Sequence, residues 1–465
     1  MFSRICSYLL KTIFWRRKSK TRDTEETDDY GCWDQLPSGV LVKIIQQISL
    51  GDCVRVSLVC KSWSLDIKQN NFPNRVQAAW LMLPLDRVNT SLLRFYDLFE
   101  GRTYNFELPK NLQGGWCCGS SKGWLAIVYG SKFNPKFSLY NPISGIQFPL
   151  PPLITLPSSQ GFLDRMKQSI NVAEFIKKVE LSSVNAPNCI VAATFDVHRT
   201  LAVCKPGDKR WTAVLEEIRE QDDDFASDIL FYNGELHVLT SAKTAFATHT
   251  IKLGDNDDDV IVKFIPDNFK IMFHKPGVVW YPEDESGIFW ITKDISIPKI
   301  VWIAKDLSVK SYLIESDGEL LIVHKTNNEI KSFSVDDGNG QLVIPRVIRF
   351  EYSQANRFIV FKIDDLIGSM RRTRLDNLEN QILFVAESGS LCVAARDIKI
   401  GFKNCVFFLG DLNYLNSNVN TNRDPYVYRE SGVFYLEDGR IERTFPCTNQ
   451  SVHCRMNWFS PNILF

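Results

Sequence analysis

The sequence lacks several features that would place it in a common functional class. Its 465 residues carry no excess charge, because 54 Lys and Arg balance 54 Asp and Glu. This balance removes any global electrostatic argument for binding nucleic acid. No apolar run approaches the roughly 18 residues that a membrane-spanning helix needs. The 12 cysteines show no CxxC spacing, which favours reduced, packed thiols over a disulfide framework.

Recognisable catalytic and metal-binding motifs are also missing. The chain has six dispersed histidines and no HExxH, GxSxG or P-loop motif. The acidic runs at 222–224 and 255–259 lack the spaced oxygens and the glycine of a calcium loop, so we interpret them as solvated loops. The basic run at 371–374 is interpreted as the exposed face of a hairpin. The sequence therefore predicts no catalytic residue, metal site or cofactor.

The first 30 residues differ in character from the rest. An amphipathic basic stretch is followed by an acidic one, and no acid precedes Asp23. A secretory signal is disfavoured because Lys11 interrupts the apolar stretch. We interpret residues 1–30 as a flexible tail with a basic cluster, which suits a protein of the nucleus or cytoplasm. The alternative is mitochondrial targeting by residues 1–22.

Residues 31–75 have the pattern of a small helical unit. Apolar side chains at 40, 41, 44, 45 and 48 fall on one face at helical period. Pro37 suits the first helical position, whereas Gly39 costs about 1 kcal/mol relative to alanine. A second helix is expected from Cys53 and a third through Trp63. So small a unit cannot bury this apolar surface alone, so it is either a docking surface or a bundle packed on the rest of the chain.

The same residues resemble the F-box, the motif that binds Skp1, the adaptor of cullin-RING ubiquitin ligases. The resemblance lies in Leu-Pro-x-x-Val-Leu-x-x-Ile-Ile from position 36 and in Val-Cys-Lys-x-Trp from position 59. Gly39 and Cys53 depart from the usual pattern, which implies weaker adaptor binding. The resemblance implies that the Skp1-binding residues are Leu36, Pro37, Val40, Leu41, Ile44, Ile45, Val59, Cys60 and Trp63.

From residue 76 to residue 465 the sequence reads as strands separated by glycine turns. Lys122-Gly123, Asn233-Gly234, Asp317-Gly318 and Ser388-Gly389 each precede alternating apolar residues, and weaker copies surround Gly287 and Gly439. Asn-Gly and Asp-Gly supply the positive φ of tight hairpins, and the alternation marks half-buried strands. Repeated hairpins over this length favour a mostly β fold, a β-propeller of about six blades, over an array of β-sandwiches.

A second resemblance covers this region. The segments Gly119–Leu125, Leu139–Gly145, Cys204–Trp211, Tyr312–Leu321, Gly432–Gly439 and Trp458–Pro461 are similar to those of the plant F-box family with the kelch-related propeller domain (KIB-type) once labelled DUF295. The resemblance implies a substrate-recognition subunit of an SCF (Skp1-cullin-F-box) ubiquitin ligase, without catalytic residues of its own. Its partners would be Skp1, through it a cullin-RING ligase, and an unknown protein substrate.

Two other functions stay open at this stage. The chain is alternatively a protein-interaction scaffold with a degenerate F-box, or, less expected, a propeller enzyme. Because loops on a rigid scaffold carry binding, the segments 155–170, 219–228, 254–259 and 413–431 are expected to hold the target.

Overall fold

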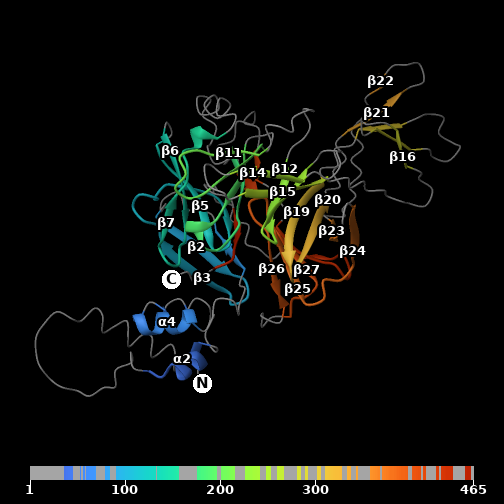
Figure 1. The fold of residues 1–465 in the computed structure, drawn as a ribbon. Helices are drawn as coiled ribbons and strands as arrows, with labels where there is room; N and C mark the ends of the chain where they lie inside the picture. The colour runs from blue at the N-terminus through green and yellow to red at the C-terminus, as the bar shows by residue number, and fades with distance from the viewer. Residues whose placement is uncertain are drawn as a thin grey trace, which may run out of the picture.

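The fold is a ring of β-sheets with a small helical unit beside it (Figure 1). The computed structural model describes residues 36–45, 53, 56–57, 59–69, 79–83, 91–131, 134–156, 175–195, 200–214, 226–240, 248–252, 259–266, 309–326, 357–366, 369–395, 401–409, 412–414, 426–428, 431–442 and 456–461, with further strands at 280–283, 288–291, 301–304, 332–336 and 342–343. Six sheets of four or five strands form the blades of a propeller, which confirms the predicted fold.

Each blade is given from its innermost strand outward. Blade 1 contains β32 (Asn457–Phe459), β1 (Trp80–Met82), β2 (Leu92–Asp97) and β3 (Arg102–Glu107). Blade 2 contains β4 (Trp116–Ser121), β5 (Trp124–Ser131), β6 (Asn134–Tyr140) and β7 (Gln147–Pro149). Blade 3 contains β8 (Ile176–Leu181), β9 (Val191–Phe195), β10 (Thr200–Cys204) and β11 (Thr212–Ala213).

The second half of the ring is less regular. Blade 4 contains β12 (Ala226–Tyr232), β13 (Glu235–Thr240), β15 (Asp259–Pro266) and β14 (Thr248–Lys252). Blade 5 contains β19 (Val309–Ser316), β20 (Glu319–Thr326), β23 (Arg357–Leu366) and β24 (Ser369–Leu375). Blade 6 contains β26 (Leu391–Ala394), β25 (Gln381–Val385), β27 (Cys405–Phe408), β30 (Gly432–Tyr435) and β31 (Ile441–Glu442). The pairs β13–β15 and β25–β27 are parallel, so the chain crosses over within blades 4 and 6.

Other strands lie outside these blades. A five-stranded sheet contains β16 (Trp280–Glu283), β17 (Ile288–Ile291), β18 (Val301–Ala304), β21 (Ser332–Asp336) and β22 (Leu342–Val343) and stands apart from the ring in Figure 1. A further hairpin pairs β28 (Leu412–Tyr414) with β29 (Tyr426–Tyr428). The weak repeat around Gly287 therefore belongs to the separate sheet, because its flanking strands are β16 and β17. Short 3₁₀ helices occupy η3 (Leu153–Thr155) and η4 (Ala186–Asn188).

The two ends of the propeller sequence close the ring. The C-terminal strand β32 pairs antiparallel with β1, with Trp80 opposite Phe459 and Met82 opposite Asn457. The indole of Trp458 donates to the carbonyl of Val385 in blade 6 at 3.0 Å. Blade 1 is thus assembled from both ends of the domain, which removes two free sheet edges.

Apolar side chains fill every junction between neighbouring blades. Six clusters of buried residues each combine two adjacent blades, in the order 1–2, 2–3, 3–4, 4–5, 5–6 and 6–1. Trp80, Trp124 and Trp458 are among the largest fully buried side chains, so these aromatic residues belong to the core. Burial of such side chains is the dominant favourable contribution to folding.

A belt of polar contacts joins the inner strands around the axis. Lys178 of β8 contacts Asp228 of β12 at 2.6 Å, and the same carboxylate accepts the backbone N–H of Leu313 in β19 at 2.7 Å. Ser121 of β4 donates to Glu180 of β8 at 3.0 Å. These groups are buried, so the hydrogen bonds satisfy polar atoms that water does not reach.

Three of the four predicted glycine turns have the backbone of a tight hairpin. Lys122-Gly123, Asn233-Gly234 and Asp317-Gly318 all have positive φ at both residues, as a type I′ turn requires. The fourth, Ser388-Gly389, joins β25 to β26 as predicted, but Gly389 does not have positive φ. Glycine is needed there for close approach instead, because a Cβ on Gly389 would lie 2.9 Å from the backbone oxygen of Ser120 in blade 2.

Three kinds of feature are absent from the described residues. No group of three or more His, Cys, Asp or Glu side chains in these segments is placed to hold a metal ion. The eight cysteines in the described ranges are all free thiols. No helix within the described part of the chain is long and apolar enough to cross a membrane.

Candidate functional site

The helical unit contains two complete helices, α2 (Ser38–Ile45) and α4 (Lys61–Gln69). The carbonyl of Pro37 accepts the N–H groups of Val40 and Leu41, so Pro37 precedes the first helical residue by one position. Cys60 takes the corresponding place before α4, and its Sγ accepts the N–H of Trp63 at 3.5 Å. A thiol thus occupies the position where Ser, Thr, Asp or Asn usually satisfies the first N–H groups of a helix.

One face of this unit is buried. Leu41, Ile45 and Trp63 are at most 5% exposed and pack with Ile67, Cys53 and Val56. Leu36, Val59 and Cys60 are partly buried against the same cluster. Burial raises the pKa of the Cys53 thiol to about 11, so the cysteine that departs from the usual F-box pattern is a packed, neutral side chain.

The opposite face remains open. Pro37, Val40 and Ile44 follow one another at three- and four-residue spacing, and Val40 is 45% exposed. Leu65 of α4 is 54% exposed, although the sequence pattern did not assign it to the site. The four residues Pro37, Val40, Ile44 and Leu65 are called the open face below.

The nine residues predicted to bind Skp1 therefore divide into two sets. Pro37, Val40 and Ile44 can contact a partner directly because their side chains reach the surface. Leu41, Ile45 and Trp63 lie inside the unit and support the open face from behind. Leu36, Val59 and Cys60 lie at the boundary between the two sets.

The unit rests on the first two blades of the propeller. Ile143, in the turn between β6 and β7, and Phe106 of β3 belong to the same apolar cluster as Leu41 and Trp63. Figure 1 shows α2 and α4 beside β2, β3 and β7. The carboxamide oxygen of Asn141 accepts the N–H groups of Ile143 and Ser144, each at 2.9 Å, which fixes the turn that holds the unit.

Several other sequence predictions fall only partly on described residues. Residues 1–30, the acidic run 222–224 and positions 157–170, 254–258, 415–425 and 429–430 of the expected target-binding loops lie outside them. Residues 226–228 are not a loop but the start of β12, and Asp228 is buried. The basic run 371–374 lies in β24, and Arg374 pairs with Asp376 at 2.9 Å on the exposed side of blade 5.

Two family models match this chain. The KIB1-4 beta-propeller model matches residues 95–434, which is most of the ring. The F-box-like model matches residues 33–65, which include α2 and the start of α4. The two matches follow the same division into helical unit and propeller that the structure shows.

Similar proteins are found in Arabidopsis thaliana. An F-box/kelch-repeat protein is 27% identical over 215 residues, covering 44% of this chain and 53% of the relative. Another F-box protein is 29% identical over 187 residues, covering 39% of this chain and 46% of the relative. The matches thus span about half the length of these relatives. Among solved structures, the tricorn protease aligns with 79% of this chain and 30% of its own chain, at 9% identity and a TM-score of 0.27, which is too low to support any argument.

Proposed function

Since the chain belongs to the KIB1-4 beta-propeller family and carries an F-box-like segment, we propose that it is the substrate-recognition subunit of an SCF ubiquitin ligase. In this role the helical unit docks on Skp1, and the propeller holds a target protein. Ubiquitin is transferred elsewhere in the complex, so this chain needs no catalytic residue and no cofactor. Its contribution is to raise the effective concentration of a target lysine near the transferring enzyme.

The open face is the observation that carries this proposal. Pro37, Val40 and Leu65 are exposed and Ile44 is partly exposed, whereas Leu41, Ile45, Trp63 and Ile67 are buried in a cluster with Ile143 and Phe106 of the propeller. Fully burying an aliphatic side chain of this size contributes about 1.5–3 kcal/mol. A few such contacts are enough for a stable complex once the costs of association are subtracted.

The experiment is capture of purified Skp1 by this chain and by two variants. Val40→Glu with Ile44→Glu places charge on the open face without touching the buried cluster, so we expect Skp1 binding to fall at least a hundredfold while the thermal unfolding of the propeller is unchanged. Ile261→Glu is the matched control, because Ile261 is also an exposed apolar residue but lies on β15 of blade 4, away from the helical unit. Skp1 binding that survives in the double variant would exclude the proposed docking surface.

The same measurement separates the ligase role from a scaffold with a degenerate F-box. A scaffold would fail to capture Skp1 even as the wild-type chain. We also propose that the protein works in the nucleus or cytoplasm, where its adaptor is available. A fluorescent fusion of the full chain tests this, and accumulation in mitochondria would contradict it.

A further inference from the structure

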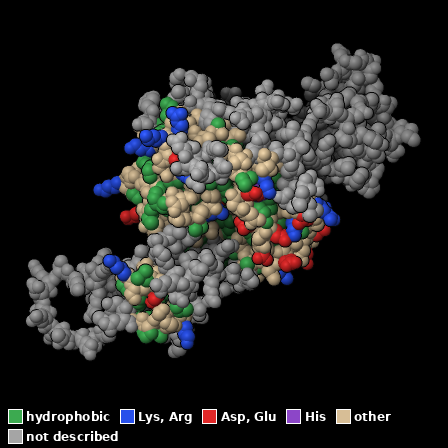
Figure 2. Space-filling view, in the orientation of Figure 1, with side chains coloured by type: hydrophobic (Ala, Val, Ile, Leu, Met, Phe, Trp, Pro, Cys, Tyr) green, Lys and Arg blue, Asp and Glu red, His purple; other side chains and the backbone are tan. Residues whose placement is uncertain are grey.

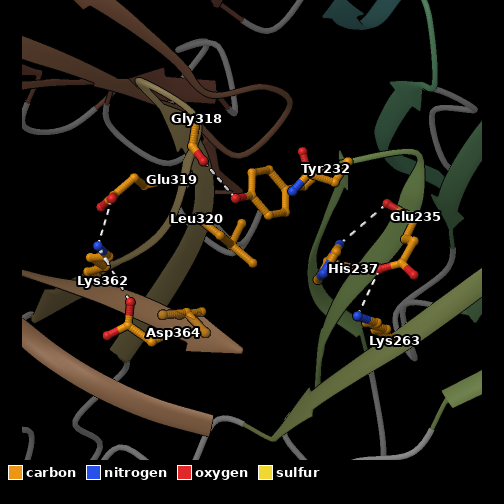
Figure 3. A pocket seen from close by; sticks show the side chains of 11 residues that line it. Tyr232, Glu235, His237, Lys263, Gly318, Glu319, Leu320, Lys362 and Asp364 are labelled. Atoms are coloured by element: carbon orange, nitrogen blue, oxygen red, sulfur yellow. Dashed lines mark hydrogen bonds and ion pairs between the residues drawn. The ribbon is translucent and has the colours of Figure 1, made fainter. Parts of the chain in front are cut away.

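A pocket of about 400 Å³ lies between blades 4 and 5. It forms where the tip of the β12–β13 hairpin approaches the tip of the β19–β20 hairpin. The hydroxyl of Tyr232 donates to the carbonyl of Gly318 at 2.7 Å and so joins the two tips (Figure 3). This volume is in the range of established ligand pockets.

The two walls of the pocket carry opposed charged groups, as Figure 3 shows. On the wall from blade 5, Lys362 contacts Glu319 at 2.6 Å and Asp364 at 3.5 Å. On the wall from blade 4, Lys263 contacts Glu235 at 2.9 Å. Three carboxylates against two ammonium groups leave a net charge of −1 in the pocket.

The carboxylates retain unused capacity to accept hydrogen bonds. Each of Glu235, Glu319 and Asp364 engages a lysine through one oxygen, and the second oxygen of each has no hydrogen-bond partner within the described segments. The two lysines, in contrast, are already held in ion pairs. The pocket therefore has acceptors to offer a guest, and the guest that complements them is a cation with several N–H donors.

The uncharged residues of the lining indicate which cationic ligand fits best. Leu320 and Ile363 are buried apolar residues of the lining, and the aromatic ring of Tyr232 lies on its blade 4 side. An arginine side chain has an aliphatic stem for such a surface, a planar guanidinium for a Tyr ring, and five donors for carboxylate oxygens. A strongly hydrated lysine ammonium matches this combination less well.

The surroundings of the pocket favour the same guest. Acidic side chains are seen over blades 5 and 6 in Figure 2, together with basic ones. Glu315 and Asp317, which are close to Gly318 in sequence, are both exposed. Acidic side chains beside the pocket attract a cationic ligand. In a ring of six, blades 4 and 5 also lie opposite blades 1 and 2, which hold the helical unit, so a partner here would not obstruct it.

We propose that this pocket binds an arginine side chain presented by a partner protein. The inference rests on the proposed function only in identifying that partner as the ligase target. Arginine residues that enter desolvated pockets often contribute a large share of binding energy at protein interfaces.

The test uses short peptides with one central arginine, citrulline or glutamate between glycines, titrated into the full chain and followed by calorimetry. Citrulline has nearly the shape of arginine but no charge, so we expect it to bind at least tenfold more weakly, and the glutamate peptide not to bind. Equal affinity for arginine and citrulline, no binding of the arginine peptide, or preferential binding of the glutamate peptide would each overturn the proposal.

Substitutions inside and outside the pocket test where the arginine peptide binds. Glu319→Gln with Asp364→Asn removes two carboxylates from one wall and should weaken the arginine peptide at least tenfold. Asp376→Asn is the matched control, because this carboxylate is in the loop that follows β24 of the same blade but outside the pocket, and it should change affinity less than twofold. If the Glu319→Gln, Asp364→Asn double variant (the pocket variant) binds the arginine peptide as tightly as the wild-type chain does, the peptide binds elsewhere and the assignment is refuted.

Binding of the arginine peptide and binding of Skp1 can be tested independently of each other. The pocket variant should capture Skp1 as the wild-type chain does, and Val40→Glu with Ile44→Glu should bind the arginine peptide normally. If the wild-type chain does not bind Skp1, only the proposed function is refuted. If the wild-type chain does not prefer the arginine peptide, only the assignment of the pocket is refuted.

Discussion

Replacing Asp228 by alanine tests whether the buried ion pair holds blades 3, 4 and 5 together. The carboxylate accepts three donors: Lys178 Nζ at 2.6 Å, the N–H of Ile229 at 2.9 Å and the N–H of Leu313 at 2.7 Å. Lys178 and Asp228 have side chains only 4% and 5% exposed, so water cannot replace the lost partner. One substitution therefore leaves a buried charge and two backbone donors unsatisfied.

The expected cost is large relative to total stability. Removing one partner of a buried ion pair costs about 3–5 kcal/mol, and each unsatisfied buried N–H about 1–3 kcal/mol, although these costs are not additive. We expect the free energy of unfolding to fall by at least about 4 kcal/mol, against the total of about 5–15 kcal/mol that is typical of a folded protein. Asp228→Asn should lose less, because its amide oxygen still accepts one backbone N–H.

Equilibrium unfolding in urea, followed by tryptophan fluorescence, measures this loss. Asp376→Ala is the control, since it breaks an ion pair with Arg374 in which the two side chains are 63% and 81% exposed. Exposed pairs of this kind contribute about 0–1 kcal/mol. If Asp228→Ala destabilises the protein no more than Asp376→Ala, the inner polar belt does not connect the blades as described.

Three further predictions concern single residues. Gly39→Ala should stabilise α2 by about 0.5–1 kcal/mol, because an added Cβ meets nothing within 4 Å; urea unfolding of the helical unit, monitored by hydrogen exchange, checks this. Gly119→Ala should destabilise the propeller by about 1–3 kcal/mol, because the added Cβ would lie 2.9 Å from the backbone oxygen of Ser388. An unchanged midpoint of urea unfolding would refute this contact. Gly401→Ala is the control, because a Cβ at that position meets nothing within 4 Å. Burial raises the pKa of Glu180, so its protonated form is favoured by folding, and the stability this gives is present below about pH 4.3 and lost as the pH rises through the folded value. Glu180→Gln should remove that contribution, and urea midpoints that fall equally with pH in both proteins would contradict the assignment.

Local patterns in the sequence were sufficient for many elements. The Asn-Gly and Asp-Gly turns at 233 and 317 have the positive φ that their residue types favour, and Lys122-Gly123 has the same backbone although lysine does not favour it. The turn Asn141–Gly145 joins β6 and β7, and the side chain of Asn141 accepts the N–H of Ile143 within the turn. These features depend on neighbours within a few residues, so the chain encodes them independently of the rest of the fold.

The same local reasoning failed where distant segments compete for a position. Ser388-Gly389 resembles the other turns, but Gly389 lacks positive φ, and a side chain there would collide with Ser120 of blade 2. Similarly, the β16–β17 hairpin follows the blade pattern and yet belongs to a sheet outside the ring. No short-range signal distinguishes these cases, because the deciding contacts join residues far apart in sequence.

The helical unit shows what the local sequence pattern determines and what tertiary packing determines. The period of the apolar residues in 36–67 determined that helices form and that one face is apolar. Only the packing against Ile143 and Phe106 decided that Leu41, Ile45 and Trp63 are covered while Val40 and Leu65 stay open. An apolar pattern cannot distinguish a side chain that supports the fold from one that awaits a partner, since both have the same hydrophobicity.

The sequence by itself thus determined the strands, the tight turns, the helical unit and the type of fold. The tertiary structure decided the closure of the ring by β32 on β1, the number of blades, the buried pair of Lys178 and Asp228, and the pocket between blades 4 and 5. The physical reason is the separation in sequence of the interacting residues. Turns and periodicity arise from neighbouring residues, whereas the other features join groups that lie tens to hundreds of residues apart and meet only when the ring closes.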